Sequence, residues 1–140
     1  KFGFVDIIDN YSGTNAANLA NYYAGVAYLN TGKYLEAIKH LDQFKADDAN
    51  VAPIAKGAIG DAFAQLDQQE EALKYYENAV SMSSSELTAP RFLLKAGIIA
   101  IDLGKPSVAL KHLNTILDDY PKSPEADKAT LYLGKAEAMK

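Results

Sequence analysis

Two histidines are the side chains best suited to acid–base chemistry near neutral pH or to binding a metal ion. His40 and His112 lie in the similar phrases Ile-Lys-His-Leu and Leu-Lys-His-Leu, each three residues after an alanine. We interpret them as the same position in two units of a repeated pattern, with Tyr75 at that position in the unit between them. Positions two units apart are not expected to converge on one metal ion or one proton, so a structural role is favoured for both histidines.

Carboxylates and serines give no better candidate for catalysis. Acid–base catalysis by carboxylates needs two groups that converge across a cleft and differ in pKa. The serine run 83–85 has neither an accompanying base nor a glycine-rich turn. The adjacent carboxylate pairs fall at predicted helix ends or links, and they are Asp47-Asp48, Glu70-Glu71 and Asp118-Asp119. We therefore predict no enzyme activity, no catalytic residue, no metal site and no cofactor.

Composition narrows the class of partner. The 140 residues are 49% apolar and 23% charged, as in an ordinary globular domain. Fourteen basic residues face 18 acidic ones with no basic block, which argues against nucleic acid as a partner. Cysteine is absent, so disulfides and thiolate metal sites are excluded. Six tyrosines at helical spacing, with no run of basic residues among them, favour packing between helices over a platform for stacking bases: Tyr22, Tyr23, Tyr28, Tyr34, Tyr75 and Tyr76.

Glycines and alanines define an internal repeat. Three glycines are each followed 12 residues later by an alanine, and a fourth glycine, Gly134, lies in the final helical stretch. The four glycines succeed one another at 35, 37 and 37 residues, close to a known 34-residue helical repeat. Small residues at these positions let two helices approach closely while large neighbours fill the space beside them. The pairs are Gly25 with Ala37, Gly60 with Ala72, and Gly97 with Ala109.

Apolar spacing and turn residues predict one domain of paired helices over residues 1–140. Residues 2–11 are interpreted as helix B of a truncated repeat, because residues 11–17 match 120–126 in phase. Thr14 and Ser123 then each lie three residues after a tyrosine and are expected to cap the next helix. The predicted repeats are 15–46 (helices 15–30 and 33–45), 51–82 (helices 51–66 and 69–82) and 88–119 (helices 88–103 and 106–119), followed by a terminal or capping helix at 123–139.

The first unit resembles the tetratricopeptide repeat (TPR) family. The matching residues are Gly25, Tyr28, Gly32, Ala37, Leu41 and Phe44. Departures from the family pattern also occur, namely Asn21, Lys56 and Leu93 at its early aromatic position, Asp67 in place of a turn glycine, and a terminal proline, Pro121, in the third unit alone. The resemblance implies an all-α fold, a right-handed TPR solenoid of antiparallel helix pairs, or alpha-alpha superhelix.

The resemblance also implies a binding site. In this family the first helix of each unit lines a concave groove that binds a protein or peptide partner, and the groove positions carried over here are mostly apolar. Tyr22, Val26 and Asp61 replace basic or amide residues of the family's clamp for C-terminal carboxylates, so that clamp is rejected. The predicted partner-binding groove comprises Leu19, Tyr22, Val26, Leu29, Ile54, Gly57, Asp61, Ala64, Arg91, Leu94, Lys95, Ile98 and Ile101, with Asp61, Arg91 and Lys95 expected to orient the partner.

A narrower resemblance bears on location. The string from Tyr11 to Tyr34 and the junction from Tyr120 to Ala126 are similar to TPR proteins of the bacterial cell envelope, closest to the single-pass inner-membrane proteins that attend the Sec translocon. This implies an N-terminal membrane anchor upstream of this sequence, with the repeats on the periplasmic side and a role as an adaptor in protein secretion, folding or assembly. A cytoplasmic location is the alternative.

A second function stays open at this point. The chain could be a structural, self-associating module, including a homodimer, whose groove is filled by a helix of its own, such as residues 2–11.

No run of residues approaches the roughly 20 apolar residues that a membrane span requires.

Overall fold

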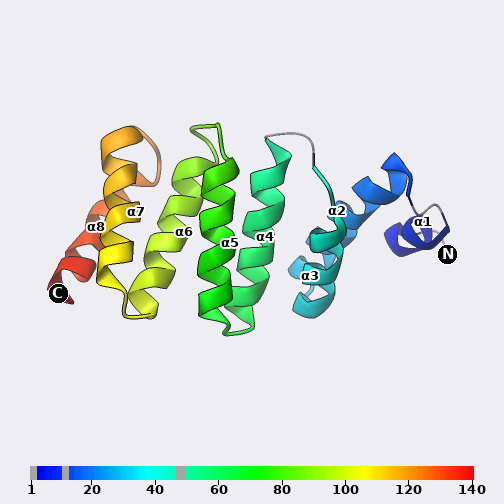
Figure 1. The fold of residues 1–140 in the computed structure, drawn as a ribbon, viewed down its shortest axis with the longest axis horizontal. Helices are drawn as coiled ribbons and strands as arrows, with labels where there is room; N and C mark the ends of the chain where they lie inside the picture. Colours follow the sequence, from blue (N-terminus) through cyan, green and yellow to red (C-terminus); the bar gives the residue numbers. More distant parts are fainter. Residues whose placement is uncertain (1–2, 11–12, 47–49) are drawn as a thin grey trace.

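The computed structural model describes residues 3–10, 13–46 and 50–140, and every regular element in these ranges is a helix. The helices stand side by side in one elongated row, with the two termini at opposite ends (Figure 1). The predicted all-α fold is therefore confirmed. The helices are α1 (Phe4–Asn10), α2 (Asn15–Asn30), α3 (Tyr34–Gln43), α4 (Val51–Gln65), α5 (Gln69–Met82), α6 (Ala89–Asp102), α7 (Pro106–Asp119) and α8 (Ala126–Ala138).

Packing follows the order of the chain, as expected for an alpha-alpha superhelix. Each described helix packs on the next one, and the first helices of neighbouring units also meet, α2 with α4 and α6 with α8. We call α2, α4, α6 and α8 the A helices, and α1, α3, α5 and α7 the B helices. Some predicted features lie outside the described residues, namely the start of the first helix at Phe2, its end at Tyr11, and the pair Asp47-Asp48.

The repeat glycines are the points where A and B helices touch. A Cβ atom added at Gly25 would lie 2.5 Å from Cγ of Leu41, and one added at Gly97 would lie 2.7 Å from Cδ2 of Leu113. A Cβ atom added at Gly60 would lie 2.8 Å from Cδ1 of the Tyr76 ring. In each unit the large side chain follows the glycine by 16 residues and sits against its bare backbone. Glycine is therefore required at these crossings for close packing.

The turns between A and B helices share one backbone conformation. Gly32, Asp67 and Gly104 all have positive φ, at 80°, 59° and 70°. In each turn the next residue donates its N–H to a carbonyl five residues back, as in Lys33 to Tyr28 at 2.9 Å and Lys105 to Ala100 at 2.8 Å. This is the hydrogen-bond pattern of a Schellman C-cap. Asp67 thus adopts the glycine conformation, which aspartate tolerates better than most residues.

The two expected hydroxyl caps differ. Thr14 Oγ1 accepts the N–H of Ala17 at 3.1 Å and caps α2 as predicted. Ser123 does not cap α8 through its side chain, because the helix begins only at Ala126 and the Oγ of Ser123 is buried with no hydrogen-bond partner. Its carbonyl oxygen accepts the N–H of Ala126 instead, at 3.1 Å. The prolines on either side of Ser123 extend the link and delay the helix start.

Candidate protein-binding groove

Four of the predicted groove residues meet at the middle of the row. Leu29 of α2, Asp61 and Ala64 of α4, and Lys95 of α6 line one hollow of about 390 Å³. We call it the central hollow. It therefore joins three successive A helices, with Tyr34 of α3 and Tyr76 of α5 contributed by the B helices. Residues separated by more than 60 positions in the sequence thus share one concave site.

Asp61 organises the polar part of the central hollow. Its Oδ1 accepts a hydrogen bond from the Tyr76 hydroxyl at 2.6 Å and from Lys95 Nζ at 2.7 Å. Burial raises the pKa of the Tyr76 phenol far above its ordinary value, and the charge and hydrogen bond of Asp61 raise it further. Tyr76 therefore remains a donor at any physiological pH. Lys95 also lies over the Tyr76 ring, 5.8 Å from its centroid.

The two charged residues at the centre of the groove pair with each other. Asp61 and Lys95, which the sequence analysis expects to orient a partner, form an ion pair across α4 and α6. Because their charges compensate, the centre of the hollow presents almost no net charge. Arg91 is the predicted groove cation without such a carboxylate partner in the described structure, and its guanidinium carbon lies 5.4 Å from the centroid of the Phe92 ring.

Two other predicted groove residues are removed from the surface. Leu94 is only 9% exposed and belongs to the main hydrophobic core. Gly57 is buried and its backbone is covered by the ring of Phe92. Both were placed in the groove by repeat phase, but Leu94 lies in the core and Phe92 of the next repeat covers Gly57. They support the groove from beneath and give a partner little to touch.

The remaining groove residues keep apolar surface. Leu19 is 49% exposed, while Val26, Ile98 and Ile101 are half-buried. Tyr22 packs its ring against Phe44 with 5.1 Å between centroids. Ile54 is also half-buried. The predicted groove positions of α2, α4 and α6 outside the central hollow are therefore mostly apolar and at least partly exposed.

The histidines have separate structural partners. Nδ1 of His40 lies 3.0 Å from Asn21 Oδ1, and the imidazole stacks on Tyr28 at 5.4 Å between centroids. Burial lowers the pKa of His40, and the charge of Lys39 lowers it further, against smaller opposing effects of Asp9 and Glu36. Nε2 of His112 lies 2.6 Å from Glu77 Oε2 of the preceding repeat. In the described ranges, no group of three or more His, Cys, Asp or Glu side chains could hold a metal ion.

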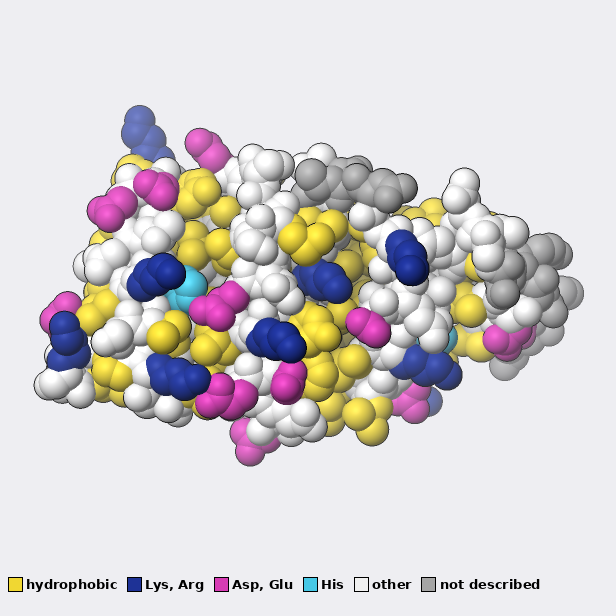
Figure 2. Space-filling model, viewed as in Figure 1, with side chains coloured by type: hydrophobic (Ala, Val, Ile, Leu, Met, Phe, Trp, Pro, Cys, Tyr) yellow, Lys and Arg dark blue, Asp and Glu magenta, His cyan; other side chains and the backbone are white. Residues whose placement is uncertain are grey.

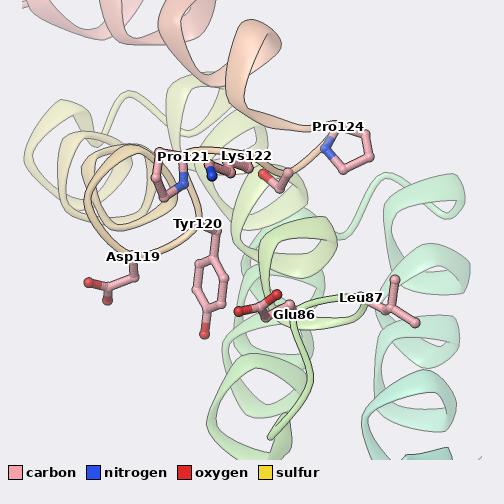
Figure 3. A pocket seen from close by; sticks show the side chains of 8 residues that line it. Glu86, Leu87, Asp119, Tyr120, Pro121, Lys122 and Pro124 are labelled. Atoms are coloured by element: carbon pink, nitrogen blue, oxygen red, sulfur yellow. The ribbon is translucent and has the colours of Figure 1, made fainter.

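Sequence reasoning missed a second hollow, of about 310 Å³, between two loops (Figure 3). It lies where the link after α5 meets the link after α7, and Figure 3 shows the ring of Tyr120 beside the carboxylate of Glu86. Leu87 at its margin is 85% exposed. The junction from Tyr120 to Pro124 is recognisable in the sequence. The hollow was not predicted because the residues of the other loop, Glu86 and Leu87, precede that junction by more than 30 positions.

The face drawn in Figure 2 has no block of one charge. Lysines and arginines alternate there with aspartates and glutamates, and hydrophobic side chains fill the spaces between them. This mixed surface agrees with the overall balance of 14 basic and 18 acidic residues. None of the described helices is both long and apolar enough to span a bilayer.

Comparisons with known proteins identify the family to which the chain belongs. The profile of the tetratricopeptide repeat matches residues 22–86 and 94–140. A search of curated proteins finds no match. Among solved structures, PcrH in complex with the chaperone binding region of PopB is similar, with a TM-score of 0.64 and 20% identity over 92% of this chain and 98% of that one. The repeat spacing, the helix pairs and the family match agree, and this chain belongs to the tetratricopeptide repeat family.

Proposed function

We propose that this chain is a non-enzymatic protein-binding module that holds a segment of a partner protein in the groove along its A helices. The observation that carries the proposal is the central hollow, to which three successive A helices contribute side chains. A site built from several repeats can follow an extended segment or a helix along the row. A single repeat could not provide such a site.

The chemistry of the groove favours an apolar or amphipathic segment. The cation and anion at its centre, Lys95 and Asp61, already compensate each other. Leu29 lines the same hollow, and Val26 and Ile98 on the neighbouring turns of α2 and α6 also keep partly exposed apolar side chains. A strongly charged peptide would find no excess of opposite charge there. Burial of apolar partner side chains would contribute roughly 25 cal/mol per Å² removed from water.

The likeness to PcrH supports this choice of partner class. The PcrH structure holds the chaperone binding region of another protein, PopB. At 20% identity the likeness concerns the fold, so the identity of the partner does not transfer. What it offers is a precedent for a protein segment bound to this architecture.

We further propose that the module works in the bacterial envelope, on the periplasmic side of the inner membrane, as a tethered adaptor in protein secretion, folding or assembly. Support comes from the residue strings Tyr11 to Tyr34 and Tyr120 to Ala126, which resemble TPR proteins of the envelope. The tether would be an N-terminal anchor upstream of residue 1. A cytoplasmic module that binds the same kind of segment is the competing proposal.

Site-specific photocrosslinking in native cells tests location and partner together. A photoreactive residue would be placed at Val26 or Ile98, and in a control protein at Leu35, which is 69% exposed on α3. Adducts with translocon subunits or emerging envelope proteins, formed from the groove positions alone, would support the envelope adaptor. Adducts with cytoplasmic proteins would refute the location and keep the groove, whereas identical adducts from Leu35 would refute the groove.

A charge placed in the groove tests the mechanism once a partner segment is identified. Ile98→Asp should weaken binding by at least about tenfold, or about 1.4 kcal/mol, because a carboxylate would be desolvated against apolar side chains. Leu35→Asp on the outer surface should leave the affinity unchanged. Titration calorimetry would measure both, with circular dichroism to verify equal helicity. Unchanged affinity for Ile98→Asp would contradict the groove.

The alternative of a groove filled by the chain's own first helix finds no support in the described residues. α1 packs on α2 at one end of the row, and no residue of α1 lines the central hollow. The described part of the expected cover, residues 3–10, therefore lies away from the central hollow.

A further inference from the structure

The second hollow is separate from the groove. Its walls are Glu86 and Leu87, just before α6, and residues 119–124, at and after the end of α7. Both links lie along one edge of the row, opposite the turns that join α4 to α5 and α6 to α7 (Figure 1). The hollow shares no residue with the central hollow. We call it the loop hollow, and a partner could occupy it whether or not the groove is filled.

Backbone hydrogen bonds fix both walls of the loop hollow. The Tyr120 carbonyl accepts the N–H of Ser123 at 3.0 Å, and the Ser123 carbonyl accepts the N–H of Ala126 at 3.1 Å. The two prolines of this link restrict its backbone further. On the opposite wall, Ser85 Oγ accepts the N–H of Leu87 at 2.9 Å. Walls that are already ordered lose little conformational entropy when a partner binds.

The lining of the loop hollow is largely apolar. Tyr120 is half-buried and packs against the main hydrophobic core, which anchors its ring. Pro121 and Pro124 are exposed on the same wall. Leu87 is 85% exposed at the margin. The site therefore combines an aromatic ring inside the hollow with an exposed leucine beside it.

The charge around the loop hollow is predominantly negative. Figure 3 shows the ring of Tyr120 between the carboxylates of Asp119 and Glu86, with the amine of Lys122 toward the backbone end of the tyrosine. None of the ion pairs among the described residues involves these three charged side chains. In the stretches 83–88 and 118–125, four carboxylates stand against the single amine of Lys122. A cation is therefore favoured as the occupant.

Ser123 adds a group that lacks a hydrogen bond. It lines the loop hollow, and its Oγ is buried without a partner in the part of the chain that the structure describes. Buried hydroxyl groups nearly always have a partner in folded proteins. An N–H donor that entered the hollow would supply the missing one.

Size and chemistry select one kind of cation. A volume of about 310 Å³ lies at the lower end of the range for ligand sites, so it suits one long side chain and not a helix. An arginine side chain matches the lining, because its planar guanidinium stacks on aromatic rings and forms hydrogen bonds with carboxylates in a fixed geometry. A lysine ammonium has the charge without the plane. No group of three or more potential metal ligands occurs in the described ranges.

We propose that the loop hollow binds an arginine side chain from a segment of a partner protein. The guanidinium lies against the Tyr120 ring, and the carboxylates of Glu86 and Asp119 balance its charge. The residue after the arginine is apolar and packs on Leu87, which extends the contact beyond a single side chain. The occupant is therefore a protein segment and not a free amine. The inference does not rest on the groove or on its partner.

A short peptide of defined sequence tests the proposal. The probe is the blocked hexapeptide Gly-Ser-Arg-Leu-Ser-Gly, with matched peptides in which citrulline or lysine replaces the arginine. Two-dimensional NMR of the isotope-labelled chain would measure and locate weak binding. The arginine peptide should shift the amide signals of residues 86–87 and 120–123 in a saturable manner. The neutral citrulline peptide should bind at least about tenfold more weakly, because hydrogen bonds between charged groups are the stronger ones.

Two double variants separate the loop hollow from general electrostatic attraction. Glu86→Gln with Asp119→Asn removes both carboxylates at exposed positions and should weaken binding of the arginine peptide at least about tenfold. Glu71→Gln with Asp102→Asn makes the same change of charge in the first turn of α5 and at the end of α6, also at exposed positions, and should leave binding unchanged. Circular dichroism would verify equal helicity.

Several results would overturn the proposal. They are equal affinity of the arginine peptide and either matched peptide, equal losses of affinity in the two double variants, and shifts confined to the residues of the central hollow. The absence of any saturable shift at residues 86–87 and 120–123 would do the same.

Discussion

The first and third repeats share one glycine–alanine spacing but are held together differently. In α6 the buried residues include large side chains, among them Phe92, Leu93 and Ile99, and they join a core that continues through α5, α7 and α8. In α2 the buried apolar residues are the alanines Ala17, Ala20 and Ala24. Less apolar area is therefore buried per residue at the N-terminal end.

Polar contacts contribute more to holding the helices of the first repeat together. Asn18 bridges α2 to the end of α3 with two hydrogen bonds, from its Nδ2 to the Lys45 carbonyl at 2.7 Å and from the Lys45 N–H to its Oδ1 at 2.8 Å. Asn21 and His40 add a buried contact at 3.0 Å. The comparison shows that the same spacing pairs the helices in both repeats, while the side chains between the spacing residues decide how strongly each pair is held.

The largest expected effect comes from emptying the core of the third repeat. Phe92→Ala should lower the free energy of unfolding by about 3–5 kcal/mol, since Phe92 is 1% exposed and its removal leaves a cavity. Tyr23→Ala in the first repeat, where the side chain is 47% exposed, is the control and should cost much less. Urea denaturation measures both. Equal losses would mean that the two repeats do not differ in the way described.

The repeat glycines provide a test with opposite signs. Gly97→Ala should destabilise the fold by about 1–3 kcal/mol, because its methyl group would meet Leu113, which is fully buried and cannot yield. Gly134→Ala should stabilise it by up to about 1 kcal/mol, because alanine has the better helix propensity and the site is open. Thermal and urea unfolding would show the difference. A loss for both variants would contradict the open face of α8.

Removing a polar bridge tests the first repeat directly. Asn18→Ala should lower the free energy of unfolding by about 1 kcal/mol, since two partly exposed hydrogen bonds to Lys45 are lost. Hydrogen exchange should show the loss concentrated in α2 and α3. Asn114→Ala, an exposed asparagine of α7, is the matched control and should have almost no effect. A loss that is spread evenly over all helices would speak against a local bridge.

The smallest expected effect is a pH dependence in the first repeat. Burial lowers the pKa of His40 below its ordinary value of 6.5, so the unfolded chain binds the proton more readily than the folded one. The contribution of neutral His40 is present above pH 6.5 and is lost as the pH falls from 6.5 toward the lowered pKa. The difference in unfolding free energy between wild type and His40→Gln should therefore shrink over this window. A difference in unfolding free energy that is constant with pH would contradict this role of His40.

Much of the fold followed from local patterns. The 12-residue spacing from glycine to alanine identified the helix pairs, and α2 has the bounds predicted for it, Asn15–Asn30. Thr14 was identified as a cap because a hydroxyl before a helix satisfies a free N–H of the first turn. These features depend on residues within one turn or one repeat of each other. Ser123 shows the limit, since the prolines beside it moved the helix start by three residues.

What the sequence alone determined about this protein is which helices pair and which side of each helix turns toward its partner, because the helical period and small residues act locally. Only the tertiary structure decided what each position then meets. Leu94 and Leu131 share one repeat phase, yet the first is buried and the second is 61% exposed. Asp61 forms an ion pair with Lys95 of another repeat, so its charge is compensated within the site. The position of a residue within its repeat determines the direction of its side chain. Its burial and its contacts depend on whether a neighbouring repeat packs against that position.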